Sequence, residues 1–104
     1  MARFDDAFKE EVRSRNDIVE VISSYLKLER RGNRFVGLCP FHSEKTPSFN
    51  VVPDSQIYHC FGCKASGDVF KFIQEREHLT FFEALVFLAK RARIPLPQEE
   101  RTPE

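Results

Sequence analysis

Cys39-Pro40-Phe41-His42 and Cys60-Phe61-Gly62-Cys63 are the two segments that decide how this chain folds. In each, two residues separate the outer pair, a spacing that lets one tight turn direct two side chains toward one metal ion. Seventeen residues lie between the segments, which is enough for a hairpin. Three thiolates and one imidazole suit Zn²⁺ and would fill its tetrahedral shell. We therefore expect a structural zinc ion held by Cys39, His42, Cys60 and Cys63.

Other interpretations of the three cysteines are an iron–sulfur cluster and unligated thiols. Because three is an odd number, the cysteines cannot close a full set of disulfides. His59 is a rival ligand, but it directly precedes Cys60, so on an extended strand its side chain points to the opposite face. We expect His59 to be a packed or surface histidine, and His78, in a charged stretch, to be solvated.

Short strands are expected around the two cysteine segments. Leu26 and Leu28 alternate with charged residues, the period of a half-buried strand. Gly32-Asn33 and Pro53-Asp54-Ser55 have the composition of tight turns. The pattern predicts a small antiparallel four-stranded sheet, with strands at residues 26–29, 34–38, 47–52 and 56–60.

Helices are expected before this sheet. Phe8 and Val12 are spaced by four among charged residues, which indicates a short amphipathic helix within residues 5–14. Asn16 or Asp17 then offers an N-cap, and Glu20 lies three residues after Asp17, as in a capping box.

Helices are also expected after the sheet. Ser66-Gly67-Asp68 is a capping sequence ahead of an apolar run, and Thr80 with Glu83 forms a clearer capping box. Pro95 and Pro97 are expected to end the last helix. The fold class is therefore α+β. We expect a domain at residues 1–97 with its zinc-binding core at about 26–64, followed by a polar linker at 98–104.

Composition and charge narrow the functional classes. No apolar run approaches the ~18 residues that a membrane span needs, and the acidic start of the chain is unlike a signal peptide. We expect a cytoplasmic protein without a membrane partner. Residues 26–64 hold six basic and three acidic side chains, a balance of +3, whereas residues 1–25 hold four and six, a balance of −2. The basic surplus coincides with the cysteines and is consistent with a polyanion partner.

Basic and aromatic residues interleave in this central stretch. Phosphates attract cations and unpaired bases stack on flat rings, so a sheet face carrying both would suit single-stranded nucleic acid. The structural alternative is that these rings form the core of a small domain.

The central stretch contains three motifs, Gly37-Leu38-Cys39-Pro40-Phe41-His42, Glu44-Lys45-Thr46-Pro47-Ser48-Phe49 and His59-Cys60-Phe61-Gly62-Cys63. They closely resemble the zinc-binding domain of bacterial DNA primase, and the resemblance extends over nearly the whole chain. It implies a zinc ribbon, an antiparallel sheet that carries the metal and is flanked by helices. It also implies recognition of single-stranded template DNA where an RNA primer starts. The residues expected to contact nucleic acid are Lys27, Arg30, Arg34, Lys45, Pro47, Phe49, Tyr58 and Lys64.

The same resemblance implies partners for the whole enzyme. A separate polymerase domain, in the same chain or a neighbouring one, would perform nucleotidyl transfer, and the replicative helicase and the single-strand-binding protein would be further partners. Primer synthesis needs carboxylates that hold Mg²⁺. Here the acidic residues fall on predicted helices, turns and the tail without a cluster. We therefore expect no catalytic residues and no Mg²⁺ in this chain, because both belong to the absent polymerase domain.

Two positions depart from the family pattern. Many relatives place a basic residue directly after the turn glycine and then Asn, whereas here the order is Gly32-Asn33-Arg34. This order would put the cation on the other side of a strand or shift its register. Arg93 stands where a glycine that stops the helix is common.

Two alternative functions remain open. A zinc ribbon can act mainly as a protein-interaction module, docking on the polymerase domain or the helicase. A zinc hydrolase or thiol enzyme is the other, but a metal shell filled by protein ligands leaves no position for water.

Overall fold

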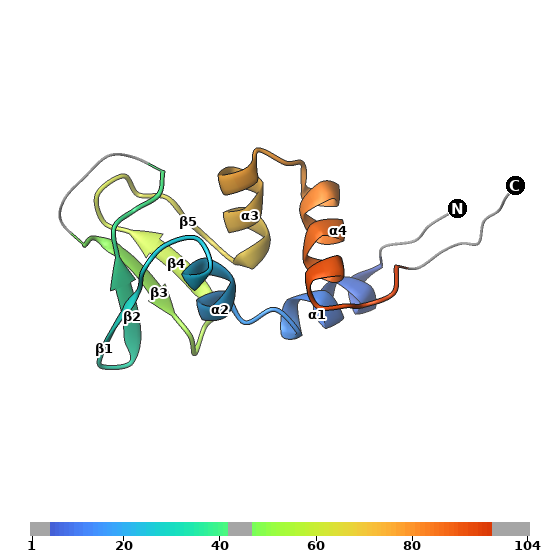
Figure 1. Ribbon diagram of the computed structural model, residues 1–104, viewed down its shortest axis with the longest axis horizontal. Coiled ribbons are helices and arrows are strands. Elements are labelled where there is room, and N and C mark those ends of the chain that lie inside the picture. Colours follow the sequence, from blue (N-terminus) through green and yellow to red (C-terminus); the bar gives the residue numbers. More distant parts are fainter. Residues whose placement is uncertain (1–4, 42–46, 97–104) are drawn as a thin grey trace, which may run out of the picture.

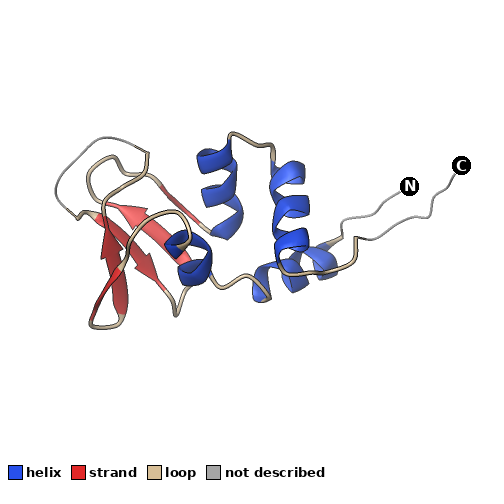
Figure 2. Cartoon of the chain, in the orientation of Figure 1, coloured by secondary structure: helices blue, strands red, loops and turns tan. Residues whose placement is uncertain are grey.

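The computed structural model describes residues 5–41 and 47–96, so His42, Lys45 and the expected linker lie outside the described residues. Its strands gather at one end of the molecule and α1 and α4 lie at the other, with α2 and α3 between them (Figure 1). Colouring by secondary structure makes this division plain (Figure 2). The helices are α1 (Asp6–Ser14), α2 (Ile18–Ser23), α3 (Val69–Glu77) and α4 (Phe81–Arg91). The strands are β1 (Glu29–Arg31), β2 (Arg34–Gly37), β3 (Phe49–Val52), β4 (Ile57–Cys60) and β5 (Ser66–Gly67).

The α+β class and the antiparallel sheet are confirmed, but the sheet has five strands rather than four, in the order β1-β2-β3-β4-β5. The additional strand is β5, whose Gly67 pairs with Tyr58 and whose Ser66 pairs with His59. Sequence reasoning assigned these two residues to a helix cap only. They form an edge strand because the chain runs back along β4 before Asp68 starts α3. None of the helices in the described ranges is long and apolar enough to cross a membrane.

The first strand begins later than predicted. It was expected at residues 26–29, whereas β1 starts at Glu29. Leu26 and Leu28 instead belong to a segment that lies close against β2. The approach is so close that a Cβ atom on Gly37 would lie 2.6 Å from the Lys27 carbonyl oxygen. The alternation therefore reflects two leucines that pack on the core and not residues that pair in the sheet.

The sheet has an inner face that packs on the helices and an outer face that does not. Residues paired across antiparallel strands share a face, so Phe35, Val51 and Tyr58 form one row on the inner face. Gly37, Phe49 and Cys60 form the next row. Successive residues alternate between faces, so the outer face carries the residues between these, including Arg34, Val36, Asn50, Ile57 and His59.

The helices begin where capping residues predict. Asp17 caps α2 by accepting hydrogen bonds from the backbone N–H groups of Val19 and Glu20, and Asp68 caps α3. Thr80 and Glu83 form the predicted capping box of α4. This helix ends at Arg91, before the prolines that were expected to stop it.

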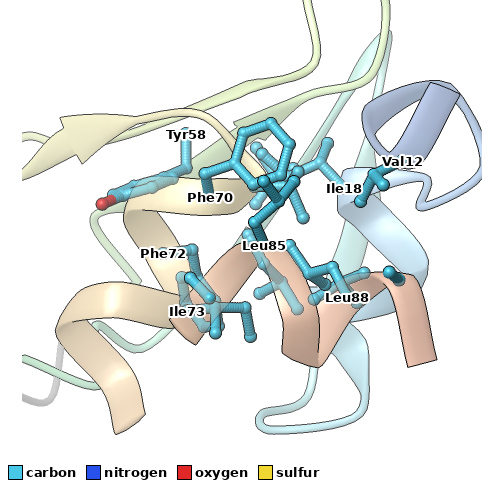
Figure 3. Packing of buried hydrophobic residues seen from close by; sticks show 14 of the residues in the cluster. Val12, Ile18, Tyr58, Phe70, Phe72, Ile73, Leu85 and Leu88 are labelled. Atoms are coloured by element: carbon cyan, nitrogen blue, oxygen red, sulfur yellow. The ribbon is translucent and has the colours of Figure 1, made fainter. Parts of the chain in front are cut away.

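The inner face of the sheet and the four helices enclose one hydrophobic core. Tyr58 reaches from β4 toward Phe72, and the two ring centroids lie 5.7 Å apart. Figure 3 shows this packing, with Phe72 and Ile73 of α3 near Leu85 and Leu88 of α4. Rings of this size dominate the burial energy of a small domain.

Candidate metal centre

The first cysteine turn follows β2. Cys39 is buried, and its Sγ accepts a hydrogen bond of 3.4 Å from the backbone N–H of Phe41. An N–H that points at a sulfur stabilises thiolate character, because it places partial positive charge beside the ligand atom. The turn therefore holds the Cys39 sulfur in an environment that suits a metal ligand.

The second cysteine turn follows β4, where Cys60 is the last residue. The Cys60 carbonyl oxygen accepts a hydrogen bond of 2.8 Å from the backbone N–H of Lys64, which adopts the left-handed conformation with φ of 67°. The Phe61 N–H donates to the Ser48 carbonyl oxygen at 2.9 Å and so ties the turn to the start of β3. This closure brings the exposed Cys63 back beside the buried Cys60.

The three thiols converge on one point. The Sγ atoms of Cys39, Cys60 and Cys63 all lie within 4.8 Å of one another, and those of Cys39 and Cys63 are 3.7 Å apart. A disulfide would require about 2.05 Å. By contrast, two sulfurs at about 2.3 Å from a tetrahedral Zn²⁺ lie roughly 3.8 Å apart. The donor set thus fits zinc, and among residues 5–41 and 47–96 this is the one cluster of its kind.

Electrostatics explain why the cysteines need a cation. Burial raises the pKa of the Cys39 thiol to about 12, because the thiolate would be poorly solvated. The Ser48 Oγ lies 3.6 Å from the Cys60 Sγ, another polar contact to the cluster. Three buried or clustered thiolates would repel one another without positive charge between them, so metal binding and thiol ionisation are coupled. The predicted fourth ligand, His42, lies outside the described residues.

The rival histidine is not part of the cluster. His59 pairs with Asn50 on the outer face of the sheet, as the alternation along the strand predicts. Its ring contacts Phe61 edge-on, with 4.7 Å between the centroids.

The sequence pattern of the CHC2 zinc finger family matches residues 4–104. The chain belongs to this family. It is 53% identical over 89 residues to the DNA primase of Halalkalibacterium halodurans, covering 86% of this chain and 15% of that protein. It is 50% identical over 92 residues to the DNA primase of Staphylococcus epidermidis, covering 88% of this chain and 15% of that protein.

A solved structure agrees. The crystal structure of the Aquifex aeolicus primase, comprising zinc-binding and RNA polymerase domains, matches with a TM-score of 0.82 and 45% identity, covering 91% of this chain and 24% of that chain. The predicted resemblance to the zinc-binding domain of bacterial DNA primase is confirmed. The CHC2 chain spans about 15% of the length of the primases that it matches.

The residues expected to contact nucleic acid divide into two groups in this CHC2 domain. Five are exposed, namely Lys27, Arg30, Arg34, Pro47 and Lys64, and Lys45 lies outside the described residues. Phe49 and Tyr58 are completely buried. Their assignment to a binding surface was wrong, because both point from the inner face into the core, where their rings stack with 5.3 Å between centroids.

Of the residues that line the outer face of the CHC2 domain, the sequence predicted Lys27, Arg34 and Pro47 and missed the others. A groove of about 450 Å³ lies there, lined by Arg34, Asn50, Val52, Ile57, His59 and Phe61. A second groove of about 240 Å³ is lined by Lys27, Glu29, Val36, Gly37, Leu38 and Pro47. The period-2 alternation of β3 and β4 could have found the first groove, since the neighbours of two buried rings must face outward.

Proposed function

We propose that this domain binds one structural Zn²⁺ through Cys39, His42, Cys60 and Cys63. The convergence of three thiols at the spacing of a tetrahedral shell supports this assignment. With four protein ligands the ion has no open position, so its contribution is to join the turn after β2 to the turn after β4. The cysteines thereby fix the relative position of the strands that carry the outer face.

We further propose that the domain is the template-recognition module of a DNA primase. It would bind single-stranded DNA at primer initiation sites, so that a separate polymerase domain can synthesise RNA primers. The observation that carries this proposal is the outer groove, the one lined by Arg34 and Phe61, where an exposed ring occurs together with a cation that forms no ion pair within residues 5–41 and 47–96. Duplex DNA would not fit this role, because its base faces are hidden in the stack.

The groove offers what an unpaired base and its phosphate require. Phe61 has 65% of its surface exposed, so much of its ring is open to solvent beside His59. Base–aromatic stacking of this kind contributes about 1–3 kcal/mol per base. Ile57, also exposed, adds an apolar wall. Arg34 lies in the same groove and supplies positive charge for the phosphate backbone of the nucleic acid.

The two grooves on the outer face lie next to each other and extend the proposed binding surface. Val36 of the second groove pairs with Asn50 of the first across β2 and β3, so the grooves are neighbours. Lys27 and Pro47 line the far end of this surface. A strand laid across both grooves would meet cations at each end.

Fluorescence anisotropy tests the proposal. Labelled oligodeoxythymidine and a duplex of equal length are titrated with the zinc-loaded protein at several salt concentrations. We expect salt-sensitive binding that prefers the single strand, and Phe61→Ala should weaken it roughly tenfold, in line with the loss of one stacked base. Phe82→Ala is the matched control, because Phe82 is 55% exposed but lies on α4. Equal losses in both variants, or no binding at low salt, would contradict template recognition.

Nucleotidyl transfer is assigned by this proposal to the polymerase domain, acting in the same chain or a neighbouring one. Catalytic Mg²⁺ would bind there. The replicative helicase and the single-strand-binding protein would meet the domain as partners of the complete primase.

The helical side supports a second candidate function, docking on a protein such as the polymerase domain or helicase. A groove of about 420 Å³ lies between α2 and α4 and is lined by Val21, Ser24, Tyr25, Phe87, Lys90 and Arg91. Phe87→Ala in a complete primase separates the two functions. A docking role predicts weaker primer synthesis with unchanged DNA binding, whereas Phe61→Ala should weaken both.

A further inference from the structure

Among the residues that the structure describes, one side chain, that of Asn50, holds Arg34 in the outer groove. Its Nε donates a hydrogen bond of 2.8 Å to the Asn50 Oδ1. Asn50 is only 6% exposed, and its Nδ2 donates to the Ser48 carbonyl oxygen at 3.0 Å. Both ends of the amide are therefore engaged, which fixes its orientation and in turn the plane of the guanidinium.

The partner that orients Arg34 is neutral. Arg31 lies directly opposite Arg34 across β1 and β2, but Arg31 pairs with the Glu29 carboxylate at 3.3 Å. Within residues 5–41 and 47–96, no carboxylate pairs with Arg34, and its two terminal nitrogens have no hydrogen-bond partner. An amide oxygen orients a guanidinium without cancelling its charge, whereas a carboxylate does both.

We propose that Asn50 is a positioning residue, which holds the Arg34 guanidinium so that its terminal nitrogens meet a phosphate of the bound strand. This inference rests on the proposed binding of single-stranded DNA. The inference also sets the register of the bound strand on the domain, because Arg34 and Phe61 line one groove. The phosphate lies at the Arg34 end, and the base of a neighbouring nucleotide stacks on Phe61. Guanidinium groups bind phosphate with two parallel hydrogen bonds, and such binding benefits most from a fixed plane.

A double-mutant cycle tests the pairing. Affinity for labelled oligodeoxythymidine is measured for Arg34→Ala, Asn50→Leu and the combined variant. We expect Asn50→Leu to lose about fivefold in affinity, the effect of one hydrogen bond. The combined variant should bind no more weakly than Arg34→Ala, because Asn50 acts only through Arg34. Arg31→Ala is the matched control and should change affinity less than Arg34→Ala.

Asn50→Asp separates orientation from charge. It keeps an oxygen for the Arg34 Nε–H but pairs the guanidinium with a carboxylate. The Nε–H resonance of Arg34, followed by nuclear magnetic resonance, should persist in Asn50→Asp and exchange rapidly with water in Asn50→Leu. DNA affinity should fall in both variants. A role of Asn50 in folding alone would not produce this split.

The outcomes are distinguishable. If the unaltered protein fails to bind DNA, the proposed function falls and this inference with it. A second outcome is that the unaltered protein binds DNA and Arg34→Ala lowers the affinity, while Asn50→Leu and Asn50→Asp bind DNA with unchanged affinity. That outcome would overturn only the positioning role of Asn50. Asn50→Ser supplies the same comparison if Asn50→Leu does not fold, as judged by zinc content and unfolding.

Discussion

Asn16 is joined to Leu88, 72 residues later in the chain, by a hydrogen bond of 3.0 Å from its Nδ2 to the Leu88 carbonyl oxygen. The same Nδ2 donates to the Val12 carbonyl oxygen at 2.8 Å, and the Asn16 Oδ1 accepts from Arg91 at 3.2 Å. One completely buried amide thus connects the end of α1 to the last turns of α4. Sequence reasoning saw Asn16 only as a possible cap.

Replacement of Asn16 should therefore be costly. We expect Asn16→Ala to lower the free energy of unfolding by about 2–4 kcal/mol, since it removes three hydrogen bonds from a completely buried amide. Chemical denaturation of the zinc-loaded protein measures the loss. Asn33→Ala, in the exposed turn between β1 and β2, should change stability by less than about 0.5 kcal/mol. Equal effects would mean that burial of the amide contributes nothing.

The features that sequence predicted well are those with a local cause. Asp17 and Thr80 start helices because their side chains satisfy nearby backbone N–H groups, and this chemistry spans only three residues. The cysteine pairs were equally readable, because a tight turn fixes the relation of Cys60 to Cys63. Residues that act across the fold, such as Asn16, left no local pattern.

The features that sequence missed depend on which side of a strand faces the core. Phe49 and Tyr58 are aromatic residues in a basic stretch, and composition alone cannot tell a buried ring from an exposed one. Both rings are buried because Phe72 of α3 packs against them. The two-residue strand β5 was missed for a similar reason, since only its pairing with β4 defines it.

Removal of the metal should disorganise the sheet. Cys63→Ser should lose bound zinc and the cooperative unfolding transition of the sheet, because ligation energy is folding energy in small zinc domains. Atomic absorption and circular dichroism report the two effects, and a strong chelator should reproduce them in the unaltered protein. An unchanged melting curve after complete zinc removal would contradict a structural role. Ser14→Ala, on α1, provides a control that keeps its zinc.

Both tyrosines should resist ionisation while the protein is folded. Burial, followed by the hydrogen bond to the Glu77 carboxylate, raises the pKa of Tyr25 to about 12 from its ordinary value of 10.0. Burial also raises the pKa of Tyr58. A raised folded-state pKa gives stability that is fully present below pH 10 and is lost as the pH rises through the folded-state value.

This expectation is measurable because the chain has two tyrosines and no tryptophan. The ultraviolet absorbance of tyrosinate should stay low in the folded protein at pH 10, where the unfolded chain is about half ionised. Tyr25→Phe keeps a ring beside Phe72 and should remove one of the two titrations. Ionisation of both tyrosines near pH 10 with the fold intact would show that neither hydroxyl is shielded.

The end of α4 offers a stabilising substitution. Arg93 adopts the left-handed conformation with φ of 60°, and the Ile94 N–H reaches back to the Ala89 carbonyl oxygen at 2.8 Å. This is the helix stop that glycine favours, so the arginine at this position carries backbone strain. We expect Arg93→Gly to raise the free energy of unfolding by about 0.5–1 kcal/mol, after the entropy of glycine in the unfolded chain is deducted.

Lys90→Gly is the natural comparison for this change. Lys90 lies inside α4, where glycine should instead destabilise by about 1 kcal/mol. Thermal or denaturant unfolding of the two variants would show opposite signs. A loss of stability in both variants would mean that the Arg93 side chain stabilises the fold by more than its left-handed backbone conformation destabilises it.

Alternation along β4 divides the effects of mutation into two kinds. Tyr58 and Cys60 face the core and the metal, whereas Ile57 and His59 face the outer groove. Substitutions at the first pair should give temperature-sensitive alleles, with little folded protein and normal affinity in what remains. Under the proposed function, substitutions at the second pair should give abundant, well-folded protein that binds single-stranded DNA poorly. Four consecutive codons would therefore serve as a genetic test of whether a defect arises from folding or from recognition.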